Sequence, residues 1–327
     1  MFSRSSIPER CPGLGWGLLA GTVILFVCSV CLGASGYSLS ELWAEQTILL
    51  YIRLPRSSGC LLAGAALAGA GFLLQTVLNN ALASPGILGV NSGAGLAVIT
   101  AAILLPGSVT ARTAGAFLGA FLTVMLVYGI ARSAGASRTT LVLSGVAVSS
   151  LFSAFIDTLI TFFPETVMDK AAFSVGGFYA VTLPALTAAG PVILLAGLAA
   201  VLLGRWLDIL VLGDEVAASL GLRVELCRGL ALTLAAALAG AAVCIAGLIG
   251  FLGLIVPHVI RKLIGSEDHR RLALLTMLGG SCLTLLCDMA ARLLFAPYEV
   301  PVGILLSVLG VPFFLWLLYK QGRRRRT

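Results

Sequence analysis

Few residues of this chain could carry acid–base chemistry, and those that could are isolated from one another. Asp157, Asp288 and Arg292 are the ionisable residues inside long apolar stretches. Asp288 and Arg292 stand four apart, and residues at this spacing lie on one face of a helix, one turn from each other. A structural ion pair is therefore favoured over a proton relay, which would need further ionisable partners in the same region.

Metal, redox and phosphate-binding motifs are also missing. His258 and His269 are the only histidines and have no partner histidine at helical spacing, so no haem or metal site is expected. Cys28 and Cys31 form a C-x-x-C pair inside an apolar run without a second pair, which indicates small apolar helix residues. A phosphate-binding loop needs Gly-Lys, and no lysine follows a glycine. The sequence predicts no catalytic residues, no metal and no cofactor bound by this chain.

The composition identifies the solvent in which the chain folds. Of its 327 residues 59% are hydrophobic and only 11% are charged, and the mean hydropathy is +1.06. Soluble proteins carry about 25% charged residues, so this chain has too few to cover a water-exposed surface. This excludes a soluble enzyme, a nucleic-acid-binding domain and a secreted disulfide scaffold. A membrane-spanning helix needs about 20 residues, which leaves room for about ten spans, and we predict an all-α polytopic membrane protein.

Ten apolar runs are bounded by charges, prolines or polar clusters. They lie at about 14–33, 57–78, 93–105, 113–131, 140–163, 184–204, twice within 229–264, and at 272–295 and 302–319. The block 229–264 is long enough for two crossings, with Gly247, Gly250 and Gly253 as places to turn, and Pro257 makes one straight helix unfavourable. The first run is long for the apolar core of a signal peptide, so an uncleaved first helix is expected.

The basic residues predict which ends of the spans face the cytoplasm. An even number of spans places both termini on one side. Sixteen of the 21 Lys and Arg residues lie at the termini or in the connections 4–5, 6–7 and 8–9, and cytoplasmic loops are enriched in these residues. Both termini are therefore predicted to be cytoplasmic, and the net charge of +7 reflects membrane orientation and not a nucleic-acid partner.

The longest cytoplasmic connection, 205–228, contains a short helix signal between Gly213 and Gly221. Asp214 can cap the helix, and Asp214 and Glu215 suit its positive N-terminus. Its small apolar face is formed by Ala217, Ala218 and Leu220. Such a helix serves either as a solvated linker or as an insert for a groove on a partner, and the residues alone leave both alternatives open.

Several motifs in order along the chain resemble those of one transporter family. They are RLPR at 53–56 followed by Gln75, NALASPGILG at 80–89, SGA at 92–94, LSGV at 143–146, GFLGLIVPH at 250–258 with Arg261, DHR at 268–270, EVPVG at 299–303 and GVPFF at 310–314. The chain is similar, over nearly its whole length, to the FecCD-type permeases of bacterial ABC importers for iron–siderophore, haem and vitamin B12. Ala81 and Leu274 stand where the family usually has proline.

The resemblance implies a fold and a set of partners. The fold is a ten-helix permease like that for vitamin B12, of the type II ABC importer class, with residues 1–327 as one transmembrane domain and 205–228 as its coupling loop. The implied partners are a second permease copy (identical or a paralogue), two cytoplasmic ATPase subunits that use ATP and Mg, a periplasmic or lipid-anchored substrate-binding protein, and membrane lipid.

The resemblance also implies roles for particular residues. By the resemblance, the binding protein docks at Arg53, Arg56 and Arg292. The alternative is that these arginines only anchor helices at the lipid interface. The resemblance places a cytoplasmic gate at Asn80, Leu82, Arg138 and Thr139. The alternative for residues 79–92 is an irregular turn that is buried against protein. The residues that the resemblance implies for coupling to the ATPase are Gly213, Asp214, Glu215, Ala217, Ala218, Leu220 and Gly221.

We therefore expect a permease subunit that moves a metal chelate across the bacterial inner membrane, with ATP hydrolysed on a separate subunit. A ferric siderophore is the first candidate cargo, and haem and cobalamin are others. The alternative is a secondary carrier without an ATPase, which the scarcity of ionisable residues inside the spans disfavours. A membrane-embedded enzyme lacks a clustered catalytic set.

Overall fold

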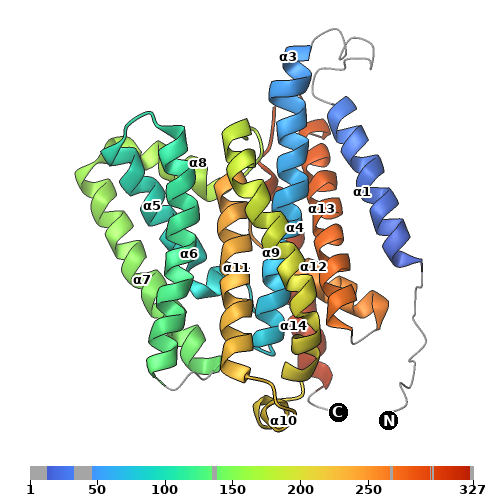
Figure 1. Cartoon of the computed structure of the whole chain (residues 1–327). Helices are drawn as coiled ribbons and strands as arrows, with labels where there is room; N and C mark the ends of the chain where they lie inside the picture. Colours follow the sequence, from blue (N-terminus) through green and yellow to red (C-terminus); the bar gives the residue numbers. More distant parts are fainter. Residues whose placement is uncertain are drawn as a thin grey trace.

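The computed structural model describes residues 13–32, 46–134, 138–265, 268–294, 296 and 298–324. Within these ranges the chain is a bundle of helices joined by short turns (Figure 1). The all-α prediction is confirmed. It follows from the composition, because in lipid a helix satisfies its backbone hydrogen bonds within its own segment.

The helices follow the predicted apolar runs closely. They are α1 (Leu14–Cys31), α3 (Gln46–Ile48), a π-helical turn η1 (Leu49–Arg53), α4 (Leu54–Val77), a 3₁₀ turn η2 (Pro85–Leu88), α5 (Val90–Leu104), α6 (Val109–Ser133), α7 (Arg138–Phe162), η3 (Pro164–Thr166), α8 (Val167–Val175), α9 (Leu183–Leu210), α10 (Asp214–Ser219), α11 (Val224–Ala246), α12 (Leu252–Ile264), α13 (His269–Leu293) and α14 (Val302–Arg324). Seven of the described helices are long and apolar enough to cross a membrane, and α5, α12 and the described apolar part of α14 are shorter. The count of ten spans therefore stays a prediction.

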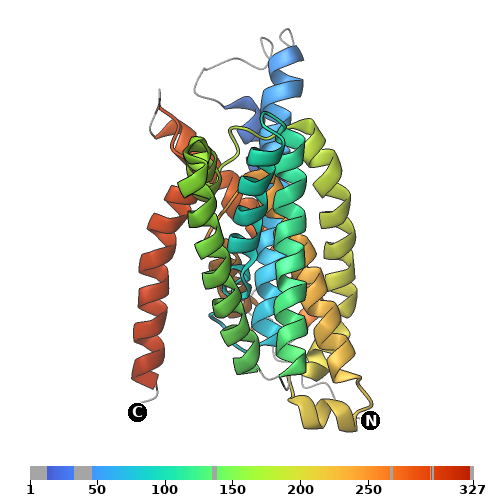
Figure 2. The ribbon, with the colours of Figure 1, turned by 90° about the vertical axis from the view of Figure 1, so that its left-hand side faces the viewer.

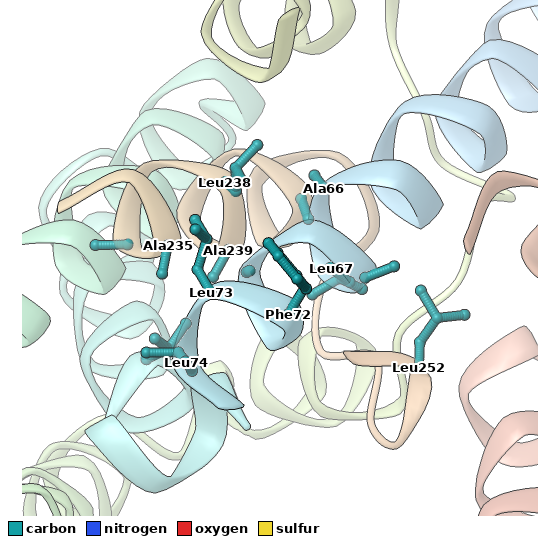
Figure 3. Close-up of a cluster of buried hydrophobic side chains, with 14 of the residues drawn as sticks. Ala66, Leu67, Phe72, Leu73, Leu74, Ala235, Leu238, Ala239 and Leu252 are labelled. Atoms are coloured by element: carbon teal, nitrogen blue, oxygen red, sulfur yellow. The ribbon is translucent and has the colours of Figure 1, made fainter. Parts of the chain in front are cut away.

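The core of the bundle is built around α4, which packs against α11, α12 and α13. Figure 3 shows Ala66, Leu67 and Leu73 of α4 beside Ala235 and Leu238 of α11. The alanines among these residues let α4 and α11 pack closely, which stabilises helix pairs in lipid, where no hydrophobic effect drives helices together.

Glycines mark the closest helix–helix contacts. A Cβ atom on Gly71 of α4 would overlap the carbonyl oxygen of Gly253 of α12, and one on Gly119 of α6 would overlap that of Gly93 of α5. The spacing Gly115-x3-Gly119 predicts such a contact, and Gly119 makes it.

The break between α11 and α12 lies at the predicted turn. Gly247 ends α11 with a φ of 66°, and Phe251 precedes α12 with a φ of 62°. The exposed backbone groups find partners on the segment around α8: Leu248 N donates to Phe173 O at 3.1 Å, and Gly177 N donates to Ala246 O at 2.8 Å. Gly253 lies inside α12 and serves packing instead of a turn.

The two ends of the bundle differ. α10 lies at one end together with the beginning of α11 and the end of α14, whereas α3 and α8 lie at the other (Figure 1). The helix ends that flank the predicted cytoplasmic connections fall at the α10 end (Figure 1), which we call the inner end; the opposite end is the outer end. Turned by 90°, the bundle shows α14 standing apart from most of the other helices (Figure 2). Its neighbours are α12 and α13.

Candidate functional site

A network of buried charges occupies the outer end of the bundle. Asp288 of α13 is fully buried and accepts hydrogen bonds from Arg56 of α4, at 3.2 Å from Nε and 3.1 Å from Nη2 to Oδ1. Its Oδ2 also lies 3.0 Å from Nε of Arg292, one turn along α13. The predicted pair between Asp288 and Arg292 is confirmed. Arg56, the third member of the network, lies on α4, 232 residues before Asp288 in the chain.

Two of the arginines in this region hold the end of α1. Arg292 donates to Leu32 O at 3.2 Å and to Ser29 Oγ at 2.9 Å. Arg53 donates to Val30 O at 2.9 Å and to Cys31 O at 2.6 Å. The last carbonyls of a helix lack partners within it and carry its negative dipole end, so two cations suit this position. Arg53 and Arg292 are buried, and their predicted contact with a binding protein stays a prediction.

Arg56 and Glu299 are the part of the network that reaches the surface. Nη1 of Arg56 donates to Glu299 at 2.8 Å, and the two side chains are 12% and 39% exposed. Together with Asp288 and Tyr179 they line a cavity of about 550 Å³. Within this network, the surface therefore carries the partly exposed carboxylate of Glu299 beside the nearly buried guanidinium of Arg56.

The predicted gate segment after α4 is a tight turn followed by η2. Asn80 Oδ1 accepts from Leu82 N at 2.9 Å, and Asn80 N donates to Gln75 O at 3.0 Å. Asn79 and Asn80 are exposed, whereas Pro85 and Leu88 of η2 are buried. The side-chain bond of Asn80 mimics a backbone turn and fixes the position of Leu82.

The second predicted gate position is the start of α7. Arg138 is the first residue of that helix, and its side chain lies outside the described residues. Thr139 is exposed. α7 reaches η2 further along, where a Cβ on Gly145 would overlap the carbonyl oxygen of Ile87. The backbone of α7 is thus in close contact with η2 at Gly145, six residues beyond Thr139.

The predicted coupling helix is α10. It begins after Gly213, which has a φ of 107°, and Gly221, with a φ of 83°, follows its end. These backbone angles favour glycine, which explains both positions. The predicted apolar face divides: Ala217 is fully buried against the bundle, while Ala218 and Leu220 are exposed.

Asp214 differs from the sequence expectation. Gly213 is the N-cap of α10 and Asp214 is its first residue, so Asp214 does not cap the helix. Its carboxylate instead accepts from Nη2 of Arg228 at 2.9 and 2.8 Å. Nη1 of the same arginine donates to Glu225 at 3.1 Å. Sequence reasoning missed Arg228; its only signal is the Glu225–Arg228 spacing of three on a helix.

Other ion pairs also join separate elements. Arg112 of α6 pairs with Asp169 of α8, and Lys170 pairs with Asp157 of α7 at 3.0 Å. At the inner end Nδ1 of His269 lies 2.7 Å from Asp208 of α9. Within the described ranges no three His, Cys, Asp or Glu side chains lie together as a metal site.

Known proteins resemble this chain over nearly its whole length. The model of the FecCD transport family matches residues 21–320. The hemin transport system permease protein HmuU of Yersinia pestis is 38% identical over 321 residues, covering 94% of this chain and 96% of that protein. The Fe(3+) dicitrate transport system permease protein FecD of Escherichia coli is 37% identical over 275 residues, covering 84% and 86%. A solved structure described as an inward-facing conformation of a metal-chelate type ABC transporter has a TM-score of 0.85 and 32% identity, covering 94% of this chain and 99% of that one.

Proposed function

This chain belongs to the FecCD transport family, and on that premise we propose that it is the membrane-spanning permease subunit of an ATP-driven importer for a metal chelate. The observation that carries the proposal is similarity to permease proteins along almost the entire chain. The chain is a multi-pass protein of the bacterial inner membrane and is not an enzyme. ATP and Mg are used by a separate subunit.

The exposed part of α10 is our candidate docking surface for the ATPase. Val216 and Leu220 are exposed there together with Leu212 just before the helix. An apolar cluster on an inner-end segment of this kind marks a protein contact. Glu215 is also exposed and adds one negative charge to the surface.

A second permease copy is proposed to cover α7 and α14. Leu143 and Phe155 of α7 and Val308 and Leu309 of α14 are exposed. The two helices lie on the same side of the bundle in Figure 2. Two copies joined by these faces would enclose a pathway between them, and that copy is either identical or a paralogue.

The outer end is the proposed contact for the binding protein. Arg56 and Glu299 are the members of the charged network available to a partner, and Arg53 and Arg292 lie behind them under the end of α1. The proposed gate at the inner end comprises Asn80, Leu82, Arg138 and Thr139. Transport then follows from two conformational states of the two permease copies. ATP on the inner side favours one state, and the docked binding protein on the outer side favours the other.

Reconstitution into lipid vesicles tests the proposed function. The permease, its cognate ATPase and its binding protein are combined, and uptake is measured with ferric hydroxamate, ferric citrate, haem and cobalamin. Ferric chelates and haem are expected first, because the similar permeases are named for Fe(3+) dicitrate and hemin. Uptake should require ATP and all three components.

The same vesicles separate the proposal from the alternative. Uptake by the permease alone, driven by a proton or sodium gradient, would refute the ATP-driven importer and support a secondary carrier. Absence of ATP-dependent uptake for every chelate with an intact three-part complex would refute the cargo class.

A further inference from the structure

α10 is too short to hold its own shape. It has six residues, and helices this short are unstable in water without tertiary contacts. The bond from Leu222 N to Ala217 O at 3.0 Å closes the end of α10 within the connection itself. The contacts that attach α10 to the bundle are the fully buried Ala217 and the ion pair of Asp214 with Arg228. The last of these joins two different helices through side chains.

Arg228 is nearly buried, and its partners are not. Its side chain is 4% exposed, whereas those of Asp214 and Glu225 are each 51% exposed. One end of the guanidinium binds the first residue of α10 and the other binds the first turn of α11. The planar fork of arginine fixes both the distance and the angle of such a link, and lysine cannot reproduce this.

The helix that carries Arg228 leads to the centre of the bundle. α11 runs from the inner end beside α10 and packs against α4, α6 and α9 (Figure 1). Its residues Ala235 and Leu238 belong to the buried cluster around α4 (Figure 3). A displacement of α11 therefore reaches the most buried helix of the protein.

We propose that Arg228 is a positioning residue that clamps α10 to α11, so that movement imposed on α10 by the ATPase becomes movement of α11. This inference rests on the proposed function and assigns the residues of α10 to two tasks. Asp214 faces the clamp, whereas Glu215, Val216 and Ala218 face the partner. Docking and transmission are then separable by mutation.

The test uses the full complex with its ATPase and binding protein in vesicles. Arg228→Met keeps the length of the side chain and removes the fork. It leaves two half-exposed carboxylates that water can solvate, so folding should survive. Arg132→Met, at an exposed arginine in the last turn of α6 outside the coupling loop, is the matched control. Three quantities are measured: ATPase copurification, ATP hydrolysis, and chelate transported per ATP.

Arg228→Met is expected to keep the ATPase bound and active and to lower transport per ATP by about tenfold, within the roughly 5–150-fold range of coupling between distant sites. Arg228→Lys should not restore it, and Arg132→Met should match the wild type. If Arg228→Met does not fold, Asp214→Ala removes the acceptor of the same link from its exposed side and should give the same loss of transport per ATP.

Two results would overturn the clamp. One is wild-type transport per ATP in a folded Arg228→Met or Asp214→Ala complex. The other is loss of ATPase copurification in both variants, because the link would then shape the docking surface and not transmit movement. Failure of the wild-type permease to bind any ATPase would instead refute the proposed function itself.

Discussion

The carboxylate of Asp288 should contribute more to the free energy of unfolding than any exposed acidic group of the chain. It is fully buried and serves two arginines at once. Asp288→Asn keeps the shape of the side chain and removes its charge. Arg56 and Arg292, with side chains only 12% and 5% exposed, then lose their shared counter-ion.

The size of the effect can be worked from the remaining contacts. Removing one partner of a buried ion pair costs about 3–5 kcal/mol. Arg56 keeps Glu299, and Arg292 keeps the carbonyls at the end of α1, so we expect the lower end, about 3 kcal/mol. The matched control is Asp157→Asn, whose partner is Lys170; the two side chains are 70% and 42% exposed. Such exposed pairs contribute about 0–1 kcal/mol.

The assay is the free energy of unfolding in mixed micelles, with dodecyl sulfate as denaturant and helix content as the signal. Asp288→Asn should be less stable than Asp157→Asn by about 2 kcal/mol, roughly a 30-fold change in the ratio of folded to unfolded protein. Combining Asp288→Asn with Arg292→Met should cost less than the sum of the two single changes, by about 0.5–3 kcal/mol. Equal stabilities of the two asparagine variants would refute the assignment of the network as a structural anchor.

Three further substitutions test packing and docking. Gly71→Ala should abolish monodisperse protein in size-exclusion chromatography, because the new Cβ overlaps the backbone of Gly253. Gly129→Ala is its control, since a Cβ there meets no described atom within 4 Å, and alanine is about 0.5–1 kcal/mol better than glycine in a helix; equal losses would contradict the packing argument. Glu215→Arg reverses an exposed charge on α10 and should lower coupled uptake by the reconstituted importer; unchanged uptake would count against docking at this helix. Ala218→Trp places a large ring on the same face and should reduce copurification of the ATPase, and undiminished copurification would disprove the contact.

Apolar runs and glycines allowed much of the fold to be predicted. Each apolar run predicted from hydropathy lies on a helix, because a membrane span is apolar almost throughout and its ends are marked by charge or proline. The break at Gly247 was also predictable, since a positive φ there favours glycine. α8 was missed, because it has only nine residues, too few for a membrane span, and lies in the segment 164–183, which mixes polar and apolar residues.

The charged sites were predictable only in part. The pair of Asp288 with Arg292 follows from a spacing of four within one helix. The contact of Arg56 with Asp288 does not, because the two residues are joined only by the packing of α4 on α13. The same holds for Asp214, whose preference for a helix N-terminus gave no indication that Arg228 lies beside it. Local sequence encodes local pairs, and tertiary packing decides the others.

The central position of α4 also constrains how the chain can be made. Gly64 of α4 lies against Gly280 of α13, where an added Cβ on either residue would crowd the other helix. A ribosome adds about 5–20 residues per second, so roughly 10–40 s separate the synthesis of these two contact points. During that interval Arg56 has entered the insertion pathway before Asp288 exists. α4 therefore enters the membrane before its buried counter-ion has been made, and its packing against α13 can form only late in synthesis.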